Sequence, residues 1–298
     1  MRQIRSYHQV ADPAAEDIVA QVTAKADRLR QRLVTIRKIV VVGSGKGGVG
    51  KSAVTANLAS VLASRGWRTA ALDADLNGPS LARMLGAHGR SLLPTDDGLA
   101  PVRGLDGVDL VSTDLLLPDA VPLAWRHPAT SAPSSSAPAF MIQSMYEGTV
   151  LRELLADVSW GERDFLLIDA PPGTDKLERL LQLLPTEAVH LLITTPSQIA
   201  RNVVARSVTL LKRHAAPGGL VLNMTGQICD RCRNEEPLWG VSVGQEMARE
   251  MGLDLWASIP YDPRLAEATD AGTSFLQRAP DAPAARALLD LADRLERA

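Results

Sequence analysis

The chain contains few cysteines and few aromatic residues. Of its 298 residues only Cys229 and Cys232 are cysteines, and aromatic residues make up 4%. Two cysteines are too few for a disulfide scaffold, so the fold must depend on a hydrophobic core, which a chain of this length can bury. The 34 acidic residues nearly balance the 32 basic ones. This balance provides no electrostatic attraction for a polyanion, and we expect no nucleic-acid partner.

Long hydrophobic runs are also missing. No stretch approaches the roughly 18 apolar residues of a membrane-spanning helix, and the first residues, MRQIRSYH, lack the apolar segment of a signal peptide. Residues 282–298 mix acidic and basic residues with alanine and leucine, whereas a membrane-surface helix has a cationic face opposite bulky apolar residues. We therefore expect 282–298 to be a packing helix in a soluble, cytoplasmic protein with no membrane partner.

Short apolar runs alternate with longer amphipathic segments along most of the chain. The short runs are typical of strands buried on both faces of a parallel sheet, and they lie at 38–43, 69–73, 108–112, 165–169, 190–194, 220–224 and 255–259. Segments of helical length lie between most of them, such as 52–65, 197–213 and 241–251. This alternation forms parallel βαβ units with right-handed crossovers. The sequence predicts an α/β fold with a doubly wound, mostly parallel sheet flanked by helices.

Two segments do not fit this alternation. Residues 14–34 have apolar positions at helical spacing with charges between them, which predicts an amphipathic helix ahead of the main fold. We accordingly divide the chain into an N-terminal helical extension, 1–35, and one domain, 36–298. Residues 127–139 are mainly proline, serine and alanine, a composition typical of a mobile loop.

The segment after the first predicted strand has the pattern of a phosphate-binding loop. In such loops glycines let backbone amides face the phosphates, a lysine reaches the terminal phosphates and a hydroxyl binds magnesium. Lys51 and Ser52 supply the last two groups, and the following helix favours anions at its N-terminus. The sequence therefore predicts a P-loop ATPase. The loop consists of Gly45, Lys46, Gly47, Gly48, Val49, Gly50, Lys51 and Ser52.

Lys46 places a second lysine in this loop. Two cations so close together repel each other unless a polyphosphate neutralises them, so the pattern favours a bound nucleotide. With Lys46 directly after the first glycine, the loop resembles that of the deviant-Walker ATPases, which include ParA, MinD, the nitrogenase iron protein and the Mrp/ApbC iron–sulfur carriers. The resemblance implies that Lys46 reaches the partner's phosphates across a nucleotide-sandwich homodimer, as an arginine finger does. A solvated surface lysine is the alternative.

Aspartates follow two of the predicted strands, at the sheet edge where ligands bind. Asp169 closes an apolar run in the Walker B manner and would reach magnesium beside Ser52, directly or through water. Asp73 and Asp75 are two residues apart, and strand alternation predicts that they point the same way. The resemblance implies that Asp73 supports magnesium through water and that Asp75 positions the attacking water. Capping of the following helix is the alternative, above all for Asp73.

Further motifs narrow the resemblance to the Mrp/ApbC carriers, over about residues 35–295. They are DADLNGPS from Asp73, DAPPGT from Asp169, Trp125-Arg126, Asn223-Met224 and IPYDP from Ile259. The resemblance implies that Asn223 contacts adenine through its amide and that the loop after Ile259 closes over the base. A turn residue at a strand end is the alternative for Asn223. One departure is Asp175-Lys176, where the family pattern has Gly-Asp.

The two cysteines form a Cys-x-x-Cys pair just beyond Asn223. A [4Fe–4S] cluster takes four cysteine ligands, so one chain cannot complete the site. A two-fold dimer would supply a second pair, and the resemblance also implies a homodimer that holds its cluster at the subunit junction. A shared zinc ion, a thiol redox pair and unliganded cysteines are the alternatives for Cys229 and Cys232.

These patterns predict a homodimer that binds ATP, hydrolyses it slowly with Mg²⁺, and carries a [4Fe–4S] cluster to apo iron–sulfur proteins. The predicted catalytic residues are Lys46, Lys51 and Asp75, and the predicted metal ligands are Ser52, Asp73, Asp169, Cys229 and Cys232. The rival prediction is a positioning switch like MinD or ParA, whose ATP-bound dimer binds a membrane or DNA and carries no cluster. A reductase like the nitrogenase iron protein fits poorly, since we associate that group with widely separated cysteines.

Overall fold

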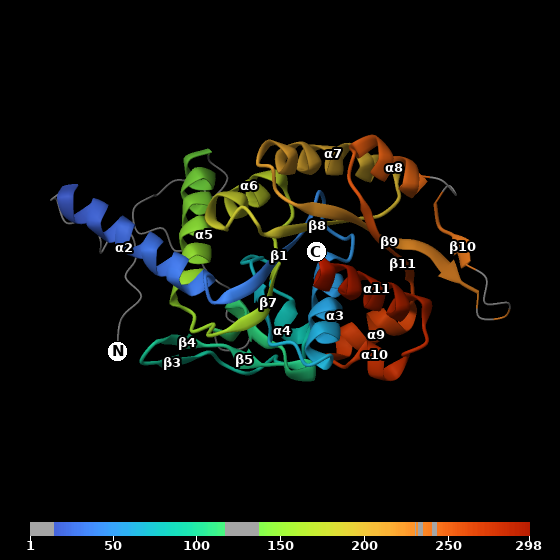
Figure 1. Ribbon diagram of the computed structural model, residues 1–298, viewed down its shortest axis with the longest axis horizontal. Helices are drawn as coiled ribbons and strands as arrows, with labels where there is room; N and C mark the ends of the chain where they lie inside the picture. The colour runs from blue at the N-terminus through green and yellow to red at the C-terminus, as the bar shows by residue number, and fades with distance from the viewer. Residues whose placement is uncertain (1–14, 117–136, 230, 232–234, 240–242) are drawn as a thin grey trace.

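The computed structural model describes residues 15–116, 137–229, 231, 235–239 and 243–298. Within these residues, nine strands form one sheet and helices cover both of its faces (Figure 1). Seven of the strands run parallel in the order β11, β9, β8, β1, β7, β2, β6. Their bounds are β1 Ile36–Ser44, β2 Thr69–Asp73, β6 Asp109–Val111, β7 Arg163–Asp169, β8 Val189–Thr194, β9 Gly218–Ile228 and β11 Leu255–Tyr261.

Short antiparallel strands extend this parallel core. The strand β5 (Val102–Arg103) pairs with β6 at one edge, and β10 (Glu235–Pro237) pairs with the far end of β9. A separate hairpin joins β3 (Leu93–Thr95) to β4 (Gly98–Ala100). The predicted α/β class and the mostly parallel sheet are confirmed, and each of the seven predicted strands is present.

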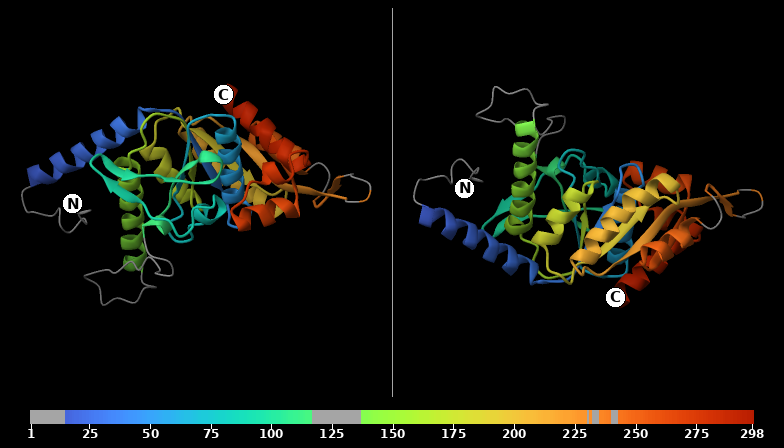
Figure 2. Two further views of the ribbon diagram at one scale, coloured as in Figure 1. Left: turned by 90° about the horizontal axis from the view of Figure 1, so that it is seen from below. Right: turned by 90° about the horizontal axis from the view of Figure 1, so that it is seen from above.

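The helices form two layers around the sheet. The helices α3 and α11 cover one face, α6, α7 and α8 cover the other, and the two views of Figure 2 show each layer in front. No described helix is long and apolar enough to cross a membrane. The bounds are α3 Lys51–Ser64, α4 Leu81–Met84, α5 Ala137–Asp157, α6 Thr174–Leu183, α7 Gln198–Arg213, α8 Val243–Met251, α9 Pro263–Ala271, α10 Phe275–Arg278 and α11 Pro283–Arg297.

Local sequence signals explain where several helices begin and where they pack. Ser197 starts α7 by accepting a hydrogen bond from the amide of Ala200, and Asp262 starts α9 by accepting one from Arg264. The helix α11 buries an apolar stripe that includes Leu288, Leu291 and Leu295 against β11 and α3. The expectation of a packing helix at 282–298 is confirmed.

The N-terminal helix α2 (Ala15–Leu33) lies beside α5 at one end of the molecule (Figure 1). Its last turns contribute Leu29 and Leu33 to the core, and Lys25 forms an ion pair with Glu153 of α5 at 2.8 Å. The helix predicted at 14–34 is therefore present and packs on the main fold. The division into 1–35 and 36–298 stays a prediction.

One loop prediction needs correction. Residues 137–139, the end of the predicted mobile loop 127–139, are the first residues of α5. The proline at 138 lies in the first turn of this helix, where its missing N–H has no partner to lose. Residues 127–136 lie outside the described residues, as does Trp125-Arg126.

Candidate nucleotide-binding site

The predicted phosphate loop joins β1 to α3 and packs closely against β9 and α7. Gly50 caps α3 with a φ of 81°, a left-handed conformation that favours glycine, and a Cβ there would overlap the amide nitrogen of Asn223. A Cβ at Gly45 would lie 2.9 Å from Val203 Cγ1 and 3.0 Å from the backbone of the same residue. A Cβ at Gly47 or Gly48 would meet nothing within 4 Å. The loop is therefore tightly packed at its two ends and open in the middle, where its amides can face a ligand.

The predicted lysine, hydroxyl and Walker B carboxylate meet at the start of α3. Asp169 ends β7 and is fully buried. Its Oδ1 lies 2.6 Å from Lys51 Nζ, and its Oδ2 accepts a hydrogen bond from Ser52 Oγ at 2.6 Å. Thr55 Oγ1, 3.0 Å from Asp169 Oδ1, was missed from the sequence, although its position four residues after Lys51 puts both on one helix face.

A second buried carboxylate lies beside this group. Asp73 ends β2 opposite Asp169 on β7 and is fully buried. Burial and the charge of Asp169 raise the pKa of Asp73 well above its usual range, although three backbone amides donate hydrogen bonds to it. Magnesium prefers hard oxygen ligands such as carboxylates and hydroxyls. Ser52 and Asp169 present such oxygens. A divalent cation there would offset the negative charges of the neighbouring carboxylates Asp169 and Asp73, so the residues fit the predicted magnesium site.

Asp73 and Asp75 accept hydrogen bonds from different amides of the segment after β2. The strand β2 ends at Asp73, so strand alternation does not extend to Asp75. Asp73 Oδ2 accepts from the amides of Ser80 and Leu81 at the start of α4, at 2.8 and 3.0 Å, which is the capping arrangement considered as its alternative. Asp75 is half-buried and accepts from the amide of Gly78 at 3.3 Å.

A partly buried ion pair, which no sequence pattern indicated, ties the loop that carries Asp75 to two helices. Glu147 of α5 is buried, pairs with Lys176 of α6 and accepts a hydrogen bond from Asn77 Nδ2 at 2.9 Å. Burial lowers the pKa of Lys176, and the charge of Arg179 adds to this, while Asp75 opposes it. The departure from the family pattern at position 176 therefore places a cation near the predicted water-positioning carboxylate.

Asn223 lies against the phosphate loop, and its contact with adenine stays a prediction. It is buried on β9, and its Nδ2 donates a hydrogen bond to the carbonyl oxygen of Val49 at 2.9 Å. The next residue, Met224, has a φ of 57°, and its carbonyl oxygen accepts a hydrogen bond from the indole N–H of Trp239 at 2.8 Å. Lys46 is half-buried in the same loop, where its carbonyl oxygen accepts from Ser44 Oγ at 3.0 Å.

Of the cysteine pair, only Cys229 belongs to the described residues. It directly follows the last residue of β9 and is half-buried, and β10 then returns antiparallel along β9. In the part of the chain that the structure describes, no three His, Cys, Asp or Glu side chains are grouped closely enough to hold a metal ion. The assignment of Cys229 and Cys232 as cluster ligands stays a prediction.

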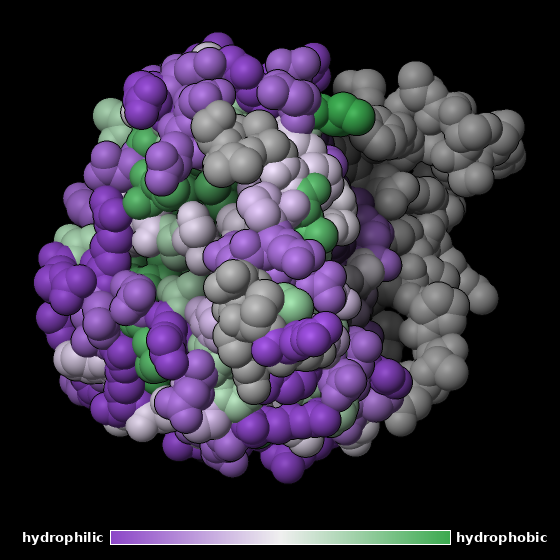
Figure 3. Space-filling model, turned by 90° about the vertical axis from the view of Figure 1, so that its right-hand side faces the viewer, coloured by the Kyte–Doolittle hydropathy of each residue, from purple (hydrophilic) through white to green (hydrophobic). Residues whose placement is uncertain are grey.

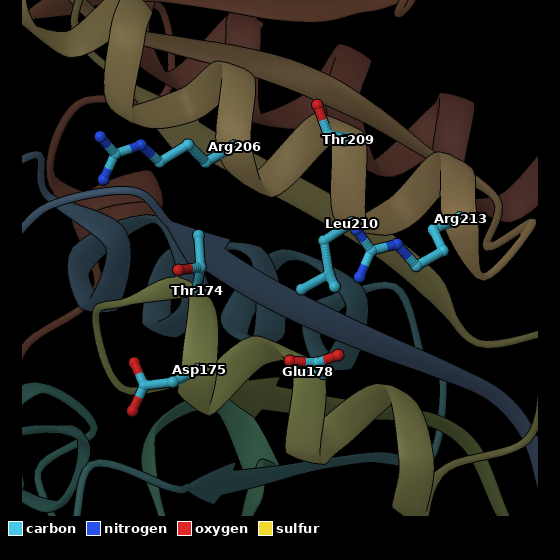
Figure 4. A pocket seen from close by; sticks show the side chains of 7 residues that line it. All are labelled: Thr174, Asp175, Glu178, Arg206, Thr209, Leu210 and Arg213. Carbon is cyan, nitrogen blue, oxygen red and sulfur yellow. The ribbon is translucent and has the colours of Figure 1, made fainter.

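A groove of about 260 Å³ with charged side chains along it lies between α6 and α7 (Figure 4). Arg206 and Arg213 line it from α7, and Asp175 and Glu178 line it from α6. No residue of the phosphate loop lines this groove. It is therefore separate from the candidate nucleotide site, although it begins at Thr174, just after the Walker B loop.

The fold and the site together define a P-loop NTPase of the deviant-Walker type. A glycine-rich loop joins a parallel strand to a helix, the Walker B aspartate ends the neighbouring strand, and Lys46 supplies the second lysine. Residues 35–296 match the family described as ParA: NUBPL iron-transfer P-loop NTPase. The chain belongs to this family, so the suspected kinship with iron–sulfur carriers is confirmed.

Individual relatives agree with this placement. An iron-sulfur cluster carrier protein of Saccharolobus solfataricus is 36% identical over 278 residues, which cover 92% of this chain and 88% of the relative. The nucleotide-binding protein of Archaeoglobus fulgidus, solved in complex with ADP, is 30% identical, with a TM-score of 0.69 over 84% of this chain and 92% of that one. The cell division ATPase MinD of Pyrococcus furiosus is 26% identical, with a TM-score of 0.60 over 88% of this chain and 99% of that one.

Proposed function

We propose that this protein is a magnesium-dependent ATPase that carries an iron–sulfur cluster, as a homodimer, to apo iron–sulfur proteins in the cytoplasm. The observation that carries the proposal is the course of β9. This strand touches the phosphate loop through Asn223 and leads directly into Cys229. One strand thus connects the nucleotide site to the cysteines. The family to which the chain belongs and the relative named as a carrier support the same function.

The residues of the phosphate site have distinct roles in this proposal. Lys51 binds the terminal phosphates and offsets the charge that develops on them, and Lys46 does so from the partner subunit. Ser52 and Asp169 would hold magnesium, and Asp73 would support the ion from farther away. When bound, the ion would neutralise part of the phosphate charge. Asp75 orients the attacking water. In this arrangement, catalysis consists of positioning and charge stabilisation.

The cluster is the cargo in this proposal, and its ligands come from two chains. Cys229 and Cys232 supply two thiolates, and a two-fold partner supplies two more, which completes the set that a [4Fe–4S] cluster needs. A cluster held between subunits is released when the subunits move apart. The reducing cytoplasm keeps such thiolates available, which supports this location.

The rival function is a positioning switch of the MinD type, because MinD shares the fold. A switch of this type that binds a membrane needs an apolar surface for it. The apolar stripe of α11 is instead buried in the core. A switch also has no need of a cysteine pair at the end of β9, so the arrangement of the molecule favours the carrier.

The test is anaerobic reconstitution with ferrous iron and sulfide, followed by measurement of iron, sulfide and absorbance near 400 nm. We expect about four irons per dimer, no cluster in Cys229→Ser or Cys232→Ser, and unchanged ATP hydrolysis in both variants. The loaded protein should restore activity to an apo iron–sulfur enzyme. Intact ATP hydrolysis without cluster uptake by the wild type would reject the carrier in favour of the switch.

A further inference from the structure

The strand β9 changes its surroundings at Asn223. Residues Gly218 to Leu222 are held between β8 and β11, because β8 pairs with them up to Leu222. Beyond this point β8 has ended, and the pairing with β11 is irregular between Ile259 and Tyr261. The end of β9 and β10 therefore project from the sheet, and Figures 1 and 2 show them extending from the body of the molecule. We call the described residues 225–229 and 235–239 the cysteine hairpin.

The phosphate loop packs directly on the base of this hairpin. Asn223 donates to the carbonyl oxygen of Val49, and a Cβ added to Gly50 would overlap the Asn223 amide and lie 3.5 Å from Met224 Cε. This close approach leaves no room for a side chain between Gly50 and Asn223, and Met224 lies within van der Waals reach. A change in the position of the loop therefore has to move Asn223 and Met224 as well.

Trp239 connects Met224 to the other side of the hairpin. Its indole N–H donates to the carbonyl oxygen of Met224 at 2.8 Å, and Met224 itself has a left-handed φ of 57°. The hairpin is closed above this point by the amide of Leu238, which donates to Thr225 at 3.3 Å, and by Thr225 Oγ1, which donates to Glu235 at 2.9 Å. Figure 3 looks onto this end of the molecule, where the surface is mostly hydrophilic. Trp239 is itself an exposed residue, at 36%.

We propose that Trp239 is a positioning residue that couples the nucleotide site to the cysteine hairpin. Binding of a nucleotide changes the contact between the phosphate loop and Asn223, the Met224 peptide moves with it, and Trp239 passes this movement to the strand that follows the cysteines. The inference rests on the proposed function, because it gives the ATP site a route to the cargo site. Coupling between sites is reciprocal, so the state of the hairpin also alters nucleotide affinity.

The test measures the hairpin without any iron. The full-length protein, with Cys232→Ser so that Cys229 is the sole thiol, is alkylated with iodoacetamide in the absence and presence of saturating Mg-ADP or a non-hydrolysable ATP analogue. We expect a nucleotide to change the alkylation rate of Cys229 by about five-fold or more, the lower end of typical coupling. With Trp239→Phe, which keeps an aromatic ring and removes the N–H, we expect this ratio to fall below about two-fold.

Two controls separate coupling from simple loss of the hairpin. Leu238→Ala changes the neighbouring exposed side chain and keeps its backbone hydrogen bond, so it should retain the wild-type ratio. In Trp239→Phe the nucleotide-free rate should stay near wild type, because the β9–β10 pairing and the Thr225–Glu235 bond remain. Tryptophan emission should change on ADP binding in the wild type and lose that change in Trp239→Phe.

The proposal is overturned if the wild-type rate does not respond to nucleotide, or if Trp239→Phe responds as the wild type does. It is also overturned if Trp239→Phe alkylates at the rate of denatured protein in both conditions, because Trp239 would then only hold the hairpin together. The assay contains no iron, so these outcomes are independent of cluster uptake, which the reconstitution experiment decides separately.

Discussion

The phosphate site and the cysteine hairpin are adjacent along β9, yet they are held in opposite ways. Asp169 is fully buried, and Lys51, Ser52 and Thr55 all contact it. In the hairpin, the residues of β10 are all exposed, and the indole of Trp239 makes a single hydrogen bond to Met224. Phosphoryl transfer needs fixed geometry, whereas a cargo site must open to release its cargo. The packed phosphate site suits ATP hydrolysis, and the exposed hairpin suits release of a cluster. The predictions below test this contrast.

The largest effect is expected from Lys51→Met. It removes the cation paired with the buried Asp169, so ATP hydrolysis should fall about 100-fold or more. The free energy of unfolding should fall by about 3 kcal/mol, because a buried carboxylate loses its partner. Steady-state hydrolysis and urea unfolding measure the two effects.

Lys46→Met is the matched control for this variant. Lys46 is only half-buried, so hydrolysis should be lost while the free energy of unfolding stays within about 0.5 kcal/mol of wild type. Equal losses of stability in the two lysine variants would contradict the view that Lys51 alone is part of the packed core.

The second prediction concerns the close approach of the phosphate loop to β9. Gly50→Ala forces a side chain into a left-handed conformation and against Asn223. We expect a loss of about 2 kcal/mol in the free energy of unfolding together with weaker ADP binding. Gly47→Ala, where a Cβ meets nothing within 4 Å, should leave stability nearly unchanged. Calorimetric titration and thermal unfolding compare the pair, and similar results for both variants would refute the packing argument.

The third prediction concerns the pH dependence of stability that a buried histidine gives to the sheet. His190 on β8 is 2% exposed, and burial lowers its pKa from 6.5 to about 4. As the pH falls below 6.5, the unfolded chain takes up the proton first, so the folded state loses stability until about pH 4. Between pH 7 and pH 5 the loss is about 2 kcal/mol.

The variant His190→Leu removes this one group. Urea unfolding at pH 7 and pH 5 should show a smaller loss for the variant, by about 2 kcal/mol. Other titrating groups, including Asp73, contribute equally to both proteins and cancel in the comparison. The same acid loss in wild type and variant would show that His190 is not responsible.

The smallest effect is expected in the hairpin itself. Glu235→Gln weakens the bond from Thr225 at an exposed site, so the free energy of unfolding should change by less than about 0.5 kcal/mol. Amide hydrogen exchange should be fast for the exposed strand β10 and slow for β1, whose residues Val40 to Val42 are fully buried. Slow exchange in the hairpin would contradict the contrast between its exposed residues and the packed phosphate site.

Local sequence patterns were enough to predict the fold class and the phosphate loop. These features are local patterns: the loop from Gly45 to Ser52 and the aspartates at the ends of two strands. They can be recognised from an apolar run next to a glycine-rich turn, without knowledge of distant residues. The same holds for α11, whose mixture of charges excluded a membrane helix. Thr55 was within reach of the sequence, since helical spacing sets it beside Lys51.

Tertiary structure alone decided which distant residues meet. Nothing local indicates that Asn223 contacts Val49, 174 residues away, or that Glu147 of α5 pairs with Lys176 of α6. Nor does strand alternation predict that Asp73 turns to the amides of α4, since the strand ends there. Trp239 is one of five tryptophans in an aromatic-poor chain, but only the folded hairpin brings its indole to Met224. Such contacts depend on the order of the strands and on the packing of the helices. Sequences with the same local patterns can differ in both, so the local patterns do not predict these contacts.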